Sequence, residues 1–382
     1  MKIVADENMP FAAECFGSLG RVRTLAGRAI TAEVVRQADI LAVRSITKVD
    51  EALLAGSRVK FVGTATIGVD HVDLAYLERA GIGFASAPGS NANSVAEYVV
   101  AAMLEVGRKR GIRLEGASIG IVGVGNVGSR VAAKARALGM EVVLNDPPLE
   151  RATRDGKYRP LGEALGCDFV TLHTPLTREG PDATHHLAGE GFFRHIRRGA
   201  VFINTSRGAV HDTPALKAAM ASGRLGGVVL DVWEGEPVID MELLRKVDIS
   251  TPHIAGYSYD GKVAGTAMIY EAACRHFGIE PTVRIVNLLP QPPVPRVELD
   301  TAGGDEQEAI RRTVQSVYVI NRDDFNTREI AAVPPGERGA FFDGLRKDYP
   351  VRREFPNTAA IVDDEGGRLA EKLRGIGFKV GA

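Results

Sequence analysis

The stretch Ala117-Ser118-Ile119-Gly120-Ile121-Val122-Gly123-Val124-Gly125-Asn126-Val127-Gly128 decides the fold class of this chain. A short apolar run leads into three glycines with the spacing G-x-G-x-x-G, and apolar positions then recur at helical spacing at Val127, Val131, Ala135 and Leu138. A strand, a glycine turn and a helix in this order predict a dinucleotide-binding βαβ unit. The alternative, a glycine-rich surface turn, does not explain the strand and the helix on either side.

The glycine spacing has a physical reason. Glycines allow a tight turn and let the backbone approach a pyrophosphate, while the helix N-terminus offers free N–H groups and the positive end of its dipole. The next predicted strand ends at Asn145, and Asp146 follows Gly128 by 18 residues. A carboxylate near that spacing accepts hydrogen bonds from ribose hydroxyls and repels a 2′-phosphate, so the sequence predicts NAD rather than NADP.

The surrounding pattern is a β/α series, which predicts an α/β fold with a doubly wound parallel (Rossmann) sheet. Residues 1–90 show the same alternation, with strands expected at Lys2–Ala5, Ile40–Val43 and Lys60–Thr64 and helices at Thr31–Gln37 and Asp50–Ala55. A helix from Ser94 to about Arg108 is apolar nearly all round, so we expect it to be buried between two domains. Six strands are expected after it: Ala117–Val122, Glu141–Asn145, Asp168–His173, Ala200–Asn204, Gly227–Asp231 and Asp248–Ser250.

The composition becomes proline-rich at Leu288-Leu289-Pro290-Gln291-Pro292-Pro293-Val294-Pro295, which predicts a stiff extended linker. The residues after it suffice for a small domain. Helices are expected from Gly303 to Val317 and over Arg368–Gly375, with a turn at Pro334-Pro335-Gly336.

Composition excludes several classes of function. The chain has 382 residues with 47 basic and 48 acidic side chains, so no electrostatic footprint for nucleic acid or an anionic membrane is expected. Acidic residues come early at the N-terminus and no apolar run approaches about 18 residues, so neither a signal peptide nor a spanning helix is expected. Three widely separated cysteines fit reduced buried thiols, and we expect a cytoplasmic protein.

Polar residues follow the later strands at one edge of the expected sheet, where ligands of open α/β sheets bind. Arg207, Glu236 and His253 emerge there. A guanidinium can pair with a carboxylate and polarise the neighbouring carbonyl. An imidazole can exchange a proton with the substrate oxygen, and a carboxylate beside it stabilises the imidazolium. Together they suit hydride transfer between a dinucleotide and a 2-hydroxy acid.

Each of these residues has a structural alternative. Arg207 could sit on a capping turn, His253 could be a core histidine, and Glu234 competes with Glu236 for the carboxylate role. His173 is the rival general acid, but it lies inside a strand pattern and is expected to be structural. His185 and His186 lack further ligands at metal spacing, so no metal is expected.

These stretches resemble the D-isomer-specific 2-hydroxyacid dehydrogenases, in particular the glycine loop, Leu172–Leu176, Asn204–Gly208, Asp231–Pro237 and Pro252–Gly256. The resemblance implies catalytic Arg207, Glu236 and His253, with Asp231 near the nicotinamide. It also implies a flavodoxin-like substrate domain from residues 1–93 and 257–285, an NAD-binding domain from 94–256 and a small α+β dimerisation domain from 286–382. The cofactor residues that it implies, with those of the glycine loop, are Gly123, Gly125, Asn126, Val127, Gly128, Asp146, Thr174, Thr205, Ser206, Arg207, Asp231 and Gly256.

Within that family, the N-terminal stretches and the tail are similar to a homodimeric member that acts on a small phosphorylated hydroxy acid. That resemblance implies substrate contacts at Ser45, Thr66 and Tyr257. The loop Val43–Thr47 follows an expected strand, and Arg44 on it offers a forked donor for a phosphate. The open alternatives are another 2-hydroxy acid, such as 3-phosphoglycerate, glyoxylate or hydroxypyruvate, and a non-catalytic protein that senses NAD(H).

Overall fold

Residues 1–299, 304–363 and 366–381 are described by the computed structural model, in which the chain divides into two units. Unit 1 consists of Met1–Asn91 and Ser258–Gln291, and unit 2 of Ala92–Tyr257 and Pro292–Ala382. The residues after the proline-rich stretch therefore belong with the nucleotide-binding region, and a separate third domain stays a prediction. Among the described residues, no helix is long and apolar enough to cross a membrane.

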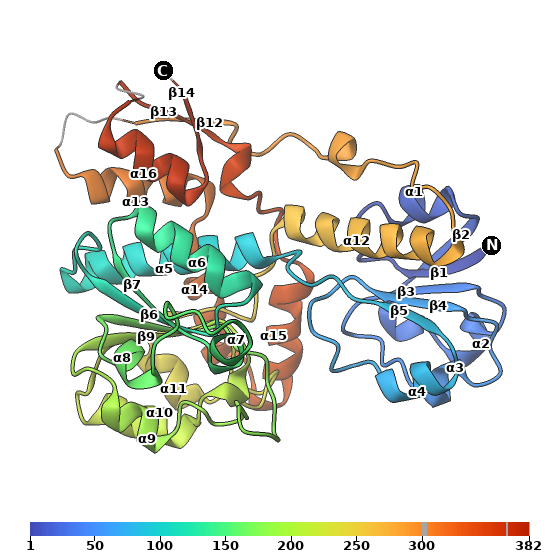
Figure 1. The fold of residues 1–382 in the computed structure, drawn as a ribbon, viewed down its shortest axis with the longest axis horizontal. Coiled ribbons are helices and arrows are strands. Elements are labelled where there is room, and N and C mark those ends of the chain that lie inside the picture. The colour runs from blue at the N-terminus through green and yellow to red at the C-terminus, as the bar shows by residue number, and fades with distance from the viewer. Residues whose placement is uncertain (300–303, 364–365, 382) are drawn as a thin grey trace. The chain divides into compact units, whose positions relative to one another are not determined.

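Unit 1 is a five-stranded parallel sheet of order β2-β1-β3-β4-β5, the order of flavodoxin-like sheets. Helices α1 and α12 cover one face, and α2, α3 and α4 cover the other (Figure 1). The helices predicted at 31–37 and 50–55 shrink to single turns. The elements are β1 (Lys2–Asp6), α1 (Ala12–Gly17), β2 (Arg21–Leu25), α2 (Ala32–Val35), β3 (Ile40–Val43), α3 (Glu51–Leu54), β4 (Phe61–Thr64), α4 (Leu74–Arg79), β5 (Gly83–Ala85) and α12 (Tyr259–Phe277).

Unit 2 contains the six predicted strands in one parallel sheet of order β11-β10-β9-β8-β6-β7. An isolated parallel bridge joins Leu144 to Tyr158 on the outer side of β7. Counting that bridge as a vestigial strand gives the 3-2-1-4-5-6 order typical of dinucleotide-binding sheets, extended by β11. The strands are β6 (Ser118–Val122), β7 (Glu141–Asn145), β8 (Phe169–Leu172), β9 (Ala200–Asn204), β10 (Leu225–Leu230) and β11 (Ile249–Ser250).

Helices cover both faces of this sheet, as the doubly wound prediction requires (Figure 1). The two long helices on one face, α5 and α6, form one core with the sheet. The shorter helices on the other face form a second core. The helices are α5 (Ala92–Arg110), α6 (Asn126–Ala137), α7 (Pro147–Thr153), α8 (Leu161–Leu165), α9 (Glu190–His195), α10 (Thr213–Ala221) and α11 (Met241–Lys246).

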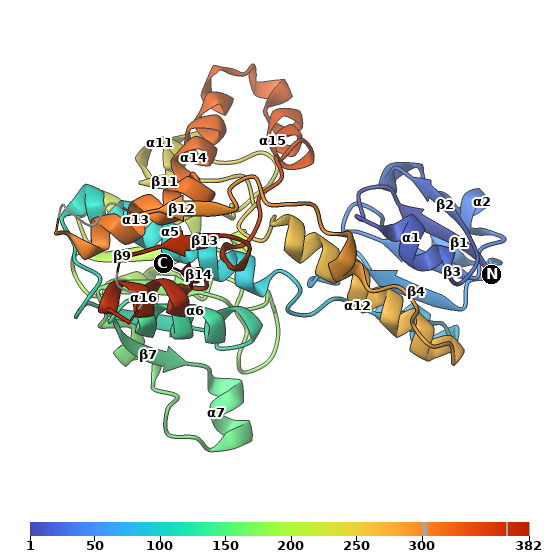
Figure 2. The same ribbon diagram turned by 90° about the horizontal axis from the view of Figure 1, so that it is seen from above.

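The C-terminal segment, residues 292–382, packs directly on this domain: α13 lies on α5, α16 on α6 and α14 on β11 (Figures 1 and 2). Its three strands pair in parallel in the order β12-β13-β14, so its sheet is of the α/β kind where the sequence predicted α+β. Its elements are β12 (Arg296–Glu298), α13 (Glu306–Val317), α14 (Ile320–Arg328), α15 (Arg338–Lys347), β13 (Ala359–Ile361), α16 (Arg368–Ile376) and β14 (Lys379–Gly381). Short 3-10 helices lie at Gly27–Ala29, Gly208–Val210, Ile285–Leu288, Glu329–Ala332, Pro335–Glu337 and Phe355–Asn357.

Helix α5 is buried as predicted, but it is sandwiched inside unit 2 between the sheet and the C-terminal segment. Its carboxylate Glu105 has no exposed side-chain surface and accepts hydrogen bonds from Arg311 (2.6 Å) and Asn321 (2.9 Å). Burial alone would raise the pKa of Glu105, but these bonds and the charge of Arg311 hold it below its usual value. The C-terminal segment thus supplies the shorter hydrogen bonds to this buried charge, whose partner on its own helix, Arg108, lies 3.5 Å away.

We therefore expect Glu105→Ala to lower the free energy of unfolding by about 3 kcal/mol at pH 7, since Arg311 loses a buried partner. Because the folded pKa of Glu105 is depressed, its contribution is present above the carboxyl's unfolded pKa and is lost as pH falls through the folded value. Urea unfolding measured at pH 7 and at about pH 3, below the usual carboxyl pKa, checks both statements. Glu163→Ala, which breaks the exposed pair with Arg159, is the control and should cost less than about 1 kcal/mol. Equal losses in the two variants would contradict this account.

Candidate active site

The carboxyl ends of β8, β9, β10 and β11 meet at one edge of the unit 2 sheet, because all four strands are parallel neighbours. Thr174 follows β8, Arg207 follows β9, Glu236 follows β10 and His253 follows β11. This edge therefore brings together chain segments that are far apart in the sequence.

His253 and Glu236 form a hydrogen-bonded pair, with 2.8 Å between Nδ1 and Oε2. The other Glu236 oxygen, Oε1, accepts a hydrogen bond from the Trp233 N–H at 2.7 Å. Burial alone would raise the pKa of Glu236, but His253 and the Trp233 N–H lower it below the usual value. The ionised carboxylate can only accept, so Nδ1 carries the proton and Nε2 is the nitrogen available for proton transfer.

The loop that carries His253 is held by the buried carboxylate of Asp231. Its Oδ1 accepts hydrogen bonds from the Thr251 hydroxyl (2.6 Å) and the Ile254 N–H (2.8 Å), and its Oδ2 accepts one from the Ala255 N–H (3.0 Å). Burial raises the pKa of Asp231 against these bonds and the His253 charge. Both oxygens are thus engaged by the loop, and a contact of Asp231 with the nicotinamide stays a prediction.

His253 itself has a left-handed backbone, with φ of 59°. Non-glycine residues rarely adopt this conformation, and such strain persists only where neighbours over-determine it. Here the His253 N–H donates to the Asp231 carbonyl at 2.7 Å, and the Ile254 N–H is bonded to the Asp231 carboxylate. A strained backbone fixed on both sides sets the direction of the imidazole.

Arg207 lies on a turn organised by the side chain of Asn204. Asn204 Oδ1 accepts hydrogen bonds from the Ser206 N–H (3.0 Å) and hydroxyl (2.8 Å), and its Nδ2 donates to the Arg207 carbonyl (3.0 Å). A Cβ on Gly208 would stand 2.0 Å from the Trp233 carbonyl oxygen, so only glycine fits there. This close approach packs the Arg207 turn against the loop that leads to Glu236.

The rival residues have other partners. Glu234 Oε1 lies 2.6 Å from His186 Nε2, so Glu236, rather than Glu234, is the carboxylate beside His253. Burial lowers the pKa of His173 to about 3, and its ring contacts the hydroxyls of Thr171 and Thr205. His173 therefore stays neutral, as expected of a structural residue. Among the described residues, no group of three or more His, Cys, Asp or Glu side chains could hold a metal ion.

The nucleotide loop fits a dinucleotide in three respects. A Cβ added at Gly125 would meet open space, so a ligand can approach the backbone there, whereas one at Gly128 would stand 2.0 Å from the Gly123 carbonyl. Helix α6 begins at Asn126 with no side-chain cap and no acid in its first turn, which leaves its N–H groups and dipole for an anion. Asp146 Oδ2 accepts from the Val124 N–H at 2.8 Å, which ties the carboxylate to the loop.

Other predicted cofactor residues lie around this loop or at the same sheet edge. The Thr174 hydroxyl is buried without a hydrogen-bond partner among the described residues, as expected where a ligand supplies one. Asn126 and Val127 form the first turn of α6, and Gly256 follows the loop held by Asp231. Their individual contacts with a cofactor stay predictions.

The predicted substrate residues are divided between the units. In unit 1, Arg44 and Ser45 follow β3 and Thr66 follows β4. Arg44 donates to the Asn8 carbonyl at 2.9 Å, and the Thr66 hydroxyl donates to the Gly68 carbonyl at 2.9 Å. Tyr257 lies in unit 2, where its hydroxyl accepts a hydrogen bond from Arg346 at 3.1 Å. Their roles toward a substrate stay predictions.

Comparison with known proteins decides the family. Residues 90–255 match the D-isomer specific 2-hydroxyacid dehydrogenase NAD binding domain, and residues 288–377 match a domain of unknown function (DUF3410). Erythronate-4-phosphate dehydrogenase of Escherichia fergusonii is 47% identical over 379 residues, which cover 99% of this chain and 98% of its own. The chain belongs to the D-isomer-specific 2-hydroxyacid dehydrogenase family.

Solved structures of other 2-hydroxyacid dehydrogenases share the fold. D-lactate dehydrogenase of Aquifex aeolicus, complexed with NAD and lactic acid, is 27% identical with a TM-score of 0.59 and covers 72% of this chain and 96% of its own. NAD⁺-bound 3-phosphoglycerate dehydrogenase of Entamoeba histolytica is 25% identical with a TM-score of 0.62 and covers 74% of this chain and 98% of its own. This dehydrogenase thus extends beyond both matched structures by about a quarter of its length.

Sequence reasoning missed the residues of the C-terminal segment that reach this edge of the sheet. Asp324, Arg346 and Arg352 contact Ser250, Tyr257 and Ala255, respectively. Nothing in the local pattern marks them, because their partners lie about 70 to 100 residues away in the chain.

Asp146→Ser should weaken NADH binding and shift the preference toward NADPH, because the carboxylate that accepts from the ribose hydroxyls and repels a 2′-phosphate is lost. Since Asp146 also holds the Val124 N–H, affinity for both cofactors should fall, but less for NADPH. Dissociation constants for NADH and NADPH, measured by calorimetry, check this. Asp240→Ser is the control, because Asp240 caps α11 in the same way as Asp146 caps α7. An unchanged ratio of the two constants in Asp146→Ser would show that another group selects the cofactor.

Proposed function

We propose that this chain oxidises 4-phospho-D-erythronate to (R)-3-hydroxy-2-oxo-4-phosphooxybutanoate with NAD⁺, a step of pyridoxal 5′-phosphate (vitamin B6) biosynthesis. The observation that carries the proposal is the His253–Glu236 pair, 2.8 Å apart, at the sheet edge that also carries Arg207. The near full-length identity of 47% with an erythronate-4-phosphate dehydrogenase supports the choice of substrate.

The residues supply the groups that this oxidation needs. When bound, NAD⁺ supplies the acceptor for the hydride that leaves C2. His253 takes the proton of the C2 hydroxyl at Nε2, and Glu236 stabilises the resulting imidazolium through Nδ1. Arg207 pairs with the substrate carboxylate and holds C2 in register with the proton acceptor. The alcohol thereby becomes a 2-oxo group, with one proton on His253 and one hydride on the cofactor.

For the substrate phosphate we propose Arg44, Ser45 and Thr66 as ligands, and we propose Tyr257 as a further contact of the substrate. A guanidinium and hydroxyl groups suit a dianionic phosphate. Arg44 is partly exposed and donates to a backbone carbonyl, so part of its fork remains for an anion.

Two alternatives are weaker. Another substrate of the same family, such as 3-phosphoglycerate, glyoxylate or hydroxypyruvate, would use the same proton-transfer pair, and only the substrate contacts would differ. A non-catalytic NAD(H) sensor has no need of a strained histidine fixed against an ionised carboxylate.

We also propose a cytoplasmic homodimer. The three cysteines are buried free thiols, as in a reducing compartment. Apolar side chains such as Phe325, 63% exposed on α14, suggest that the C-terminal segment contributes to the contact between subunits. Light scattering should give about twice the chain mass of 40.8 kDa, and a monomer mass would refute the dimer.

His253→Ala should lower kcat about 10²- to 10⁴-fold with little change in NADH affinity, because it removes the proton acceptor and no cofactor contact. Glu236→Gln should move the acidic limb of the kcat/KM profile to lower pH, since the imidazolium loses its counter-charge and releases its proton more readily. Rates followed at the NADH absorbance band across pH check both variants. Glu234→Gln, whose carboxylate pairs with His186, is the matched control and should leave the limb in place. Near-normal turnover of His253→Ala would assign the proton to another residue.

D-Erythronate without its phosphate should be a poor substrate. Hydrogen bonds to charged groups contribute about 1.5–3 kcal/mol each, so losing two or three should lower kcat/KM by several powers of ten. Arg44→Ala should reduce the difference in kcat/KM between the two acids, because it should lower kcat/KM only for the phosphorylated acid. Lys48→Ala is the control on the same loop, since its side chain is exposed and paired with Asp50.

Comparable kcat/KM for the two acids would refute the phosphate assignment. Faster oxidation of 3-phosphoglycerate than of 4-phospho-D-erythronate would refute the proposed substrate and leave the family in place.

A further inference from the structure

The C-terminal segment contacts the loop that carries His253. We propose that Arg346 of this segment is a positioning residue of the active site, which fixes Tyr257 and places a positive charge beside the Glu236–His253 pair. This inference rests on the proposed function, and it assigns the C-terminal segment a part in catalysis within its own chain.

The segment contacts both ends of the loop. Before His253, the Ser250 N–H and hydroxyl both donate to Asp324 Oδ1 on α14, each at 2.7 Å. After His253, the buried guanidinium of Arg352 donates to the Ala255 carbonyl at 2.6 Å and to the Ser94 hydroxyl. The loop is therefore bonded to Asp231 in its own domain and to the C-terminal segment on either side of the histidine.

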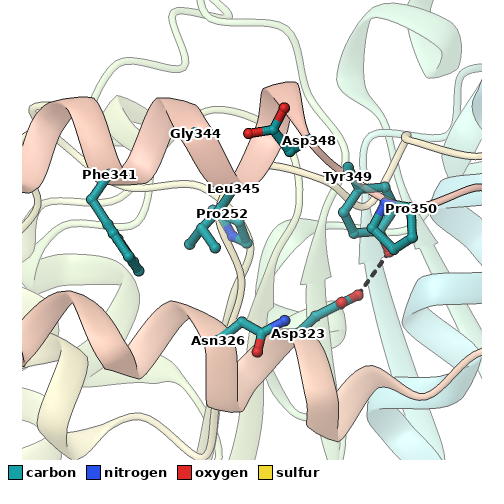
Figure 3. A pocket seen from close by; sticks show the side chains of 9 residues that line it. All are labelled: Pro252, Asp323, Asn326, Phe341, Gly344, Leu345, Asp348, Tyr349 and Pro350. Atoms are coloured by element: carbon teal, nitrogen blue, oxygen red, sulfur yellow. Dashed lines mark hydrogen bonds between the residues drawn. The ribbon is translucent and has the colours of Figure 1, made fainter.

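The middle of the loop also meets the segment. Figure 3 shows Pro252, the residue before His253, in a groove between α14 and α15. Phe341 and Leu345 of α15 line the groove with it. At one end, the Tyr349 hydroxyl donates to Asp323 Oδ2 at 2.7 Å and so joins the chain after α15 to α14. These contacts limit how far the loop can move.

Arg346 lies on α15 and contacts Tyr257. Its Nη2 donates to the Tyr257 hydroxyl at 3.1 Å, and its Cζ stands 5.8 Å from the centre of the Tyr257 ring, within reach of a cation–π interaction. Tyr349 packs edge-on against the same ring, with 6.1 Å between ring centroids. Tyr257, the predicted substrate contact of unit 2, is thus oriented by two side chains of the C-terminal segment.

The same helix lies against the loop that carries Glu236. A Cβ on Gly339 of α15 would stand 3.3 Å from Pro237 Cγ, so the helix touches the residue after Glu236. Burial opposes the charge of Arg346, but Tyr257, Glu236 and Asp343 raise its pKa above the usual value, and Arg346 in turn helps to lower that of Glu236. Glu236 therefore interacts with both His253 and Arg346, and Asp231 also interacts with His253.

The share of this chain that the matched structures cover fits a role of the C-terminal segment that is specific to this chain. The lactate and phosphoglycerate dehydrogenases cover 72–74% of this chain and at least 96% of their own. The extra length of this chain is close to that of the C-terminal segment. Its matched domain of unknown function would then have, besides any part in assembly, the role of fixing the proton-transfer loop.

The test compares Arg346→Met and Arg346→Lys with Lys347→Met, an exposed neighbour on the same helix that undergoes the same loss of charge. Arg346→Met should raise KM for 4-phospho-D-erythronate about tenfold or more, while the NADH dissociation constant and Tm stay near the unaltered values. The acidic limb of its kcat/KM profile should move to higher pH, because the positive charge of Arg346, which disfavours the imidazolium, is removed. Arg346→Lys should keep the limb in place but not restore KM, because an ammonium lacks the planar fork.

Two further measurements keep the proposal testable whatever the first variants do. The double variant Arg346→Met with Tyr257→Phe should lose less than the sum of the single variants, since both remove one contact. If the unaltered enzyme does not oxidise 4-phospho-D-erythronate, the proposed function fails. Arg346 is then tested by an NMR titration of the His253 ring, whose midpoint should rise in Arg346→Met and stay in place in Lys347→Met.

Kinetics of Arg346→Met that match those of Lys347→Met would overturn the proposal. Additive effects in the double variant, or an unchanged titration of the His253 ring, would also overturn it.

Discussion

The buried carboxylate of Asp231 is the interaction on which the candidate site depends. Asp231 follows β10, and its carboxylate accepts hydrogen bonds from one hydroxyl and two N–H groups of the loop after β11. The backbone carbonyl of Asp231 accepts a hydrogen bond from the His253 N–H. Without the carboxylate, the loop would lose three of the hydrogen bonds that fix the left-handed backbone of His253, and we expect that strain to relax. The distance of 2.8 Å between His253 and Glu236 depends on this anchor and on the Trp233 N–H at the other Glu236 oxygen.

The C-terminal segment adds a second layer to this arrangement. Its Arg311 pairs with the buried Glu105 on α5. Its Asp324, Arg346 and Arg352 form hydrogen bonds with the loop that carries His253. The chain thus stabilises its nucleotide-binding domain and its proton-transfer loop with the same set of residues. A segment with these contacts is integral to the domain on which it packs, whatever its part in assembly.

Most features that depend on local pattern could be predicted from the sequence. The glycine loop, the six strands of unit 2 and the edge that carries Arg207, Glu236 and His253 all come from short-range periodicity and strand order. The edge strand β2 was missed because only two of its five side chains are even partly buried, so it lacks an apolar run. The vestigial strand at Tyr158 and the contacts of Arg346 were missed because one residue makes no period and a distant partner leaves no local signal.

The most direct test of the central claim is the fate of the hydrogen at C2. The enzyme would be given NAD⁺ and 4-phospho-D-erythronate deuterated at C2, and the products examined by NMR. Direct hydride transfer, with His253 handling only the hydroxyl proton, predicts that the deuterium is recovered at C4 of the reduced nicotinamide. Deuterium recovered in the solvent would mean that a base removes it as a proton, and this would contradict the account.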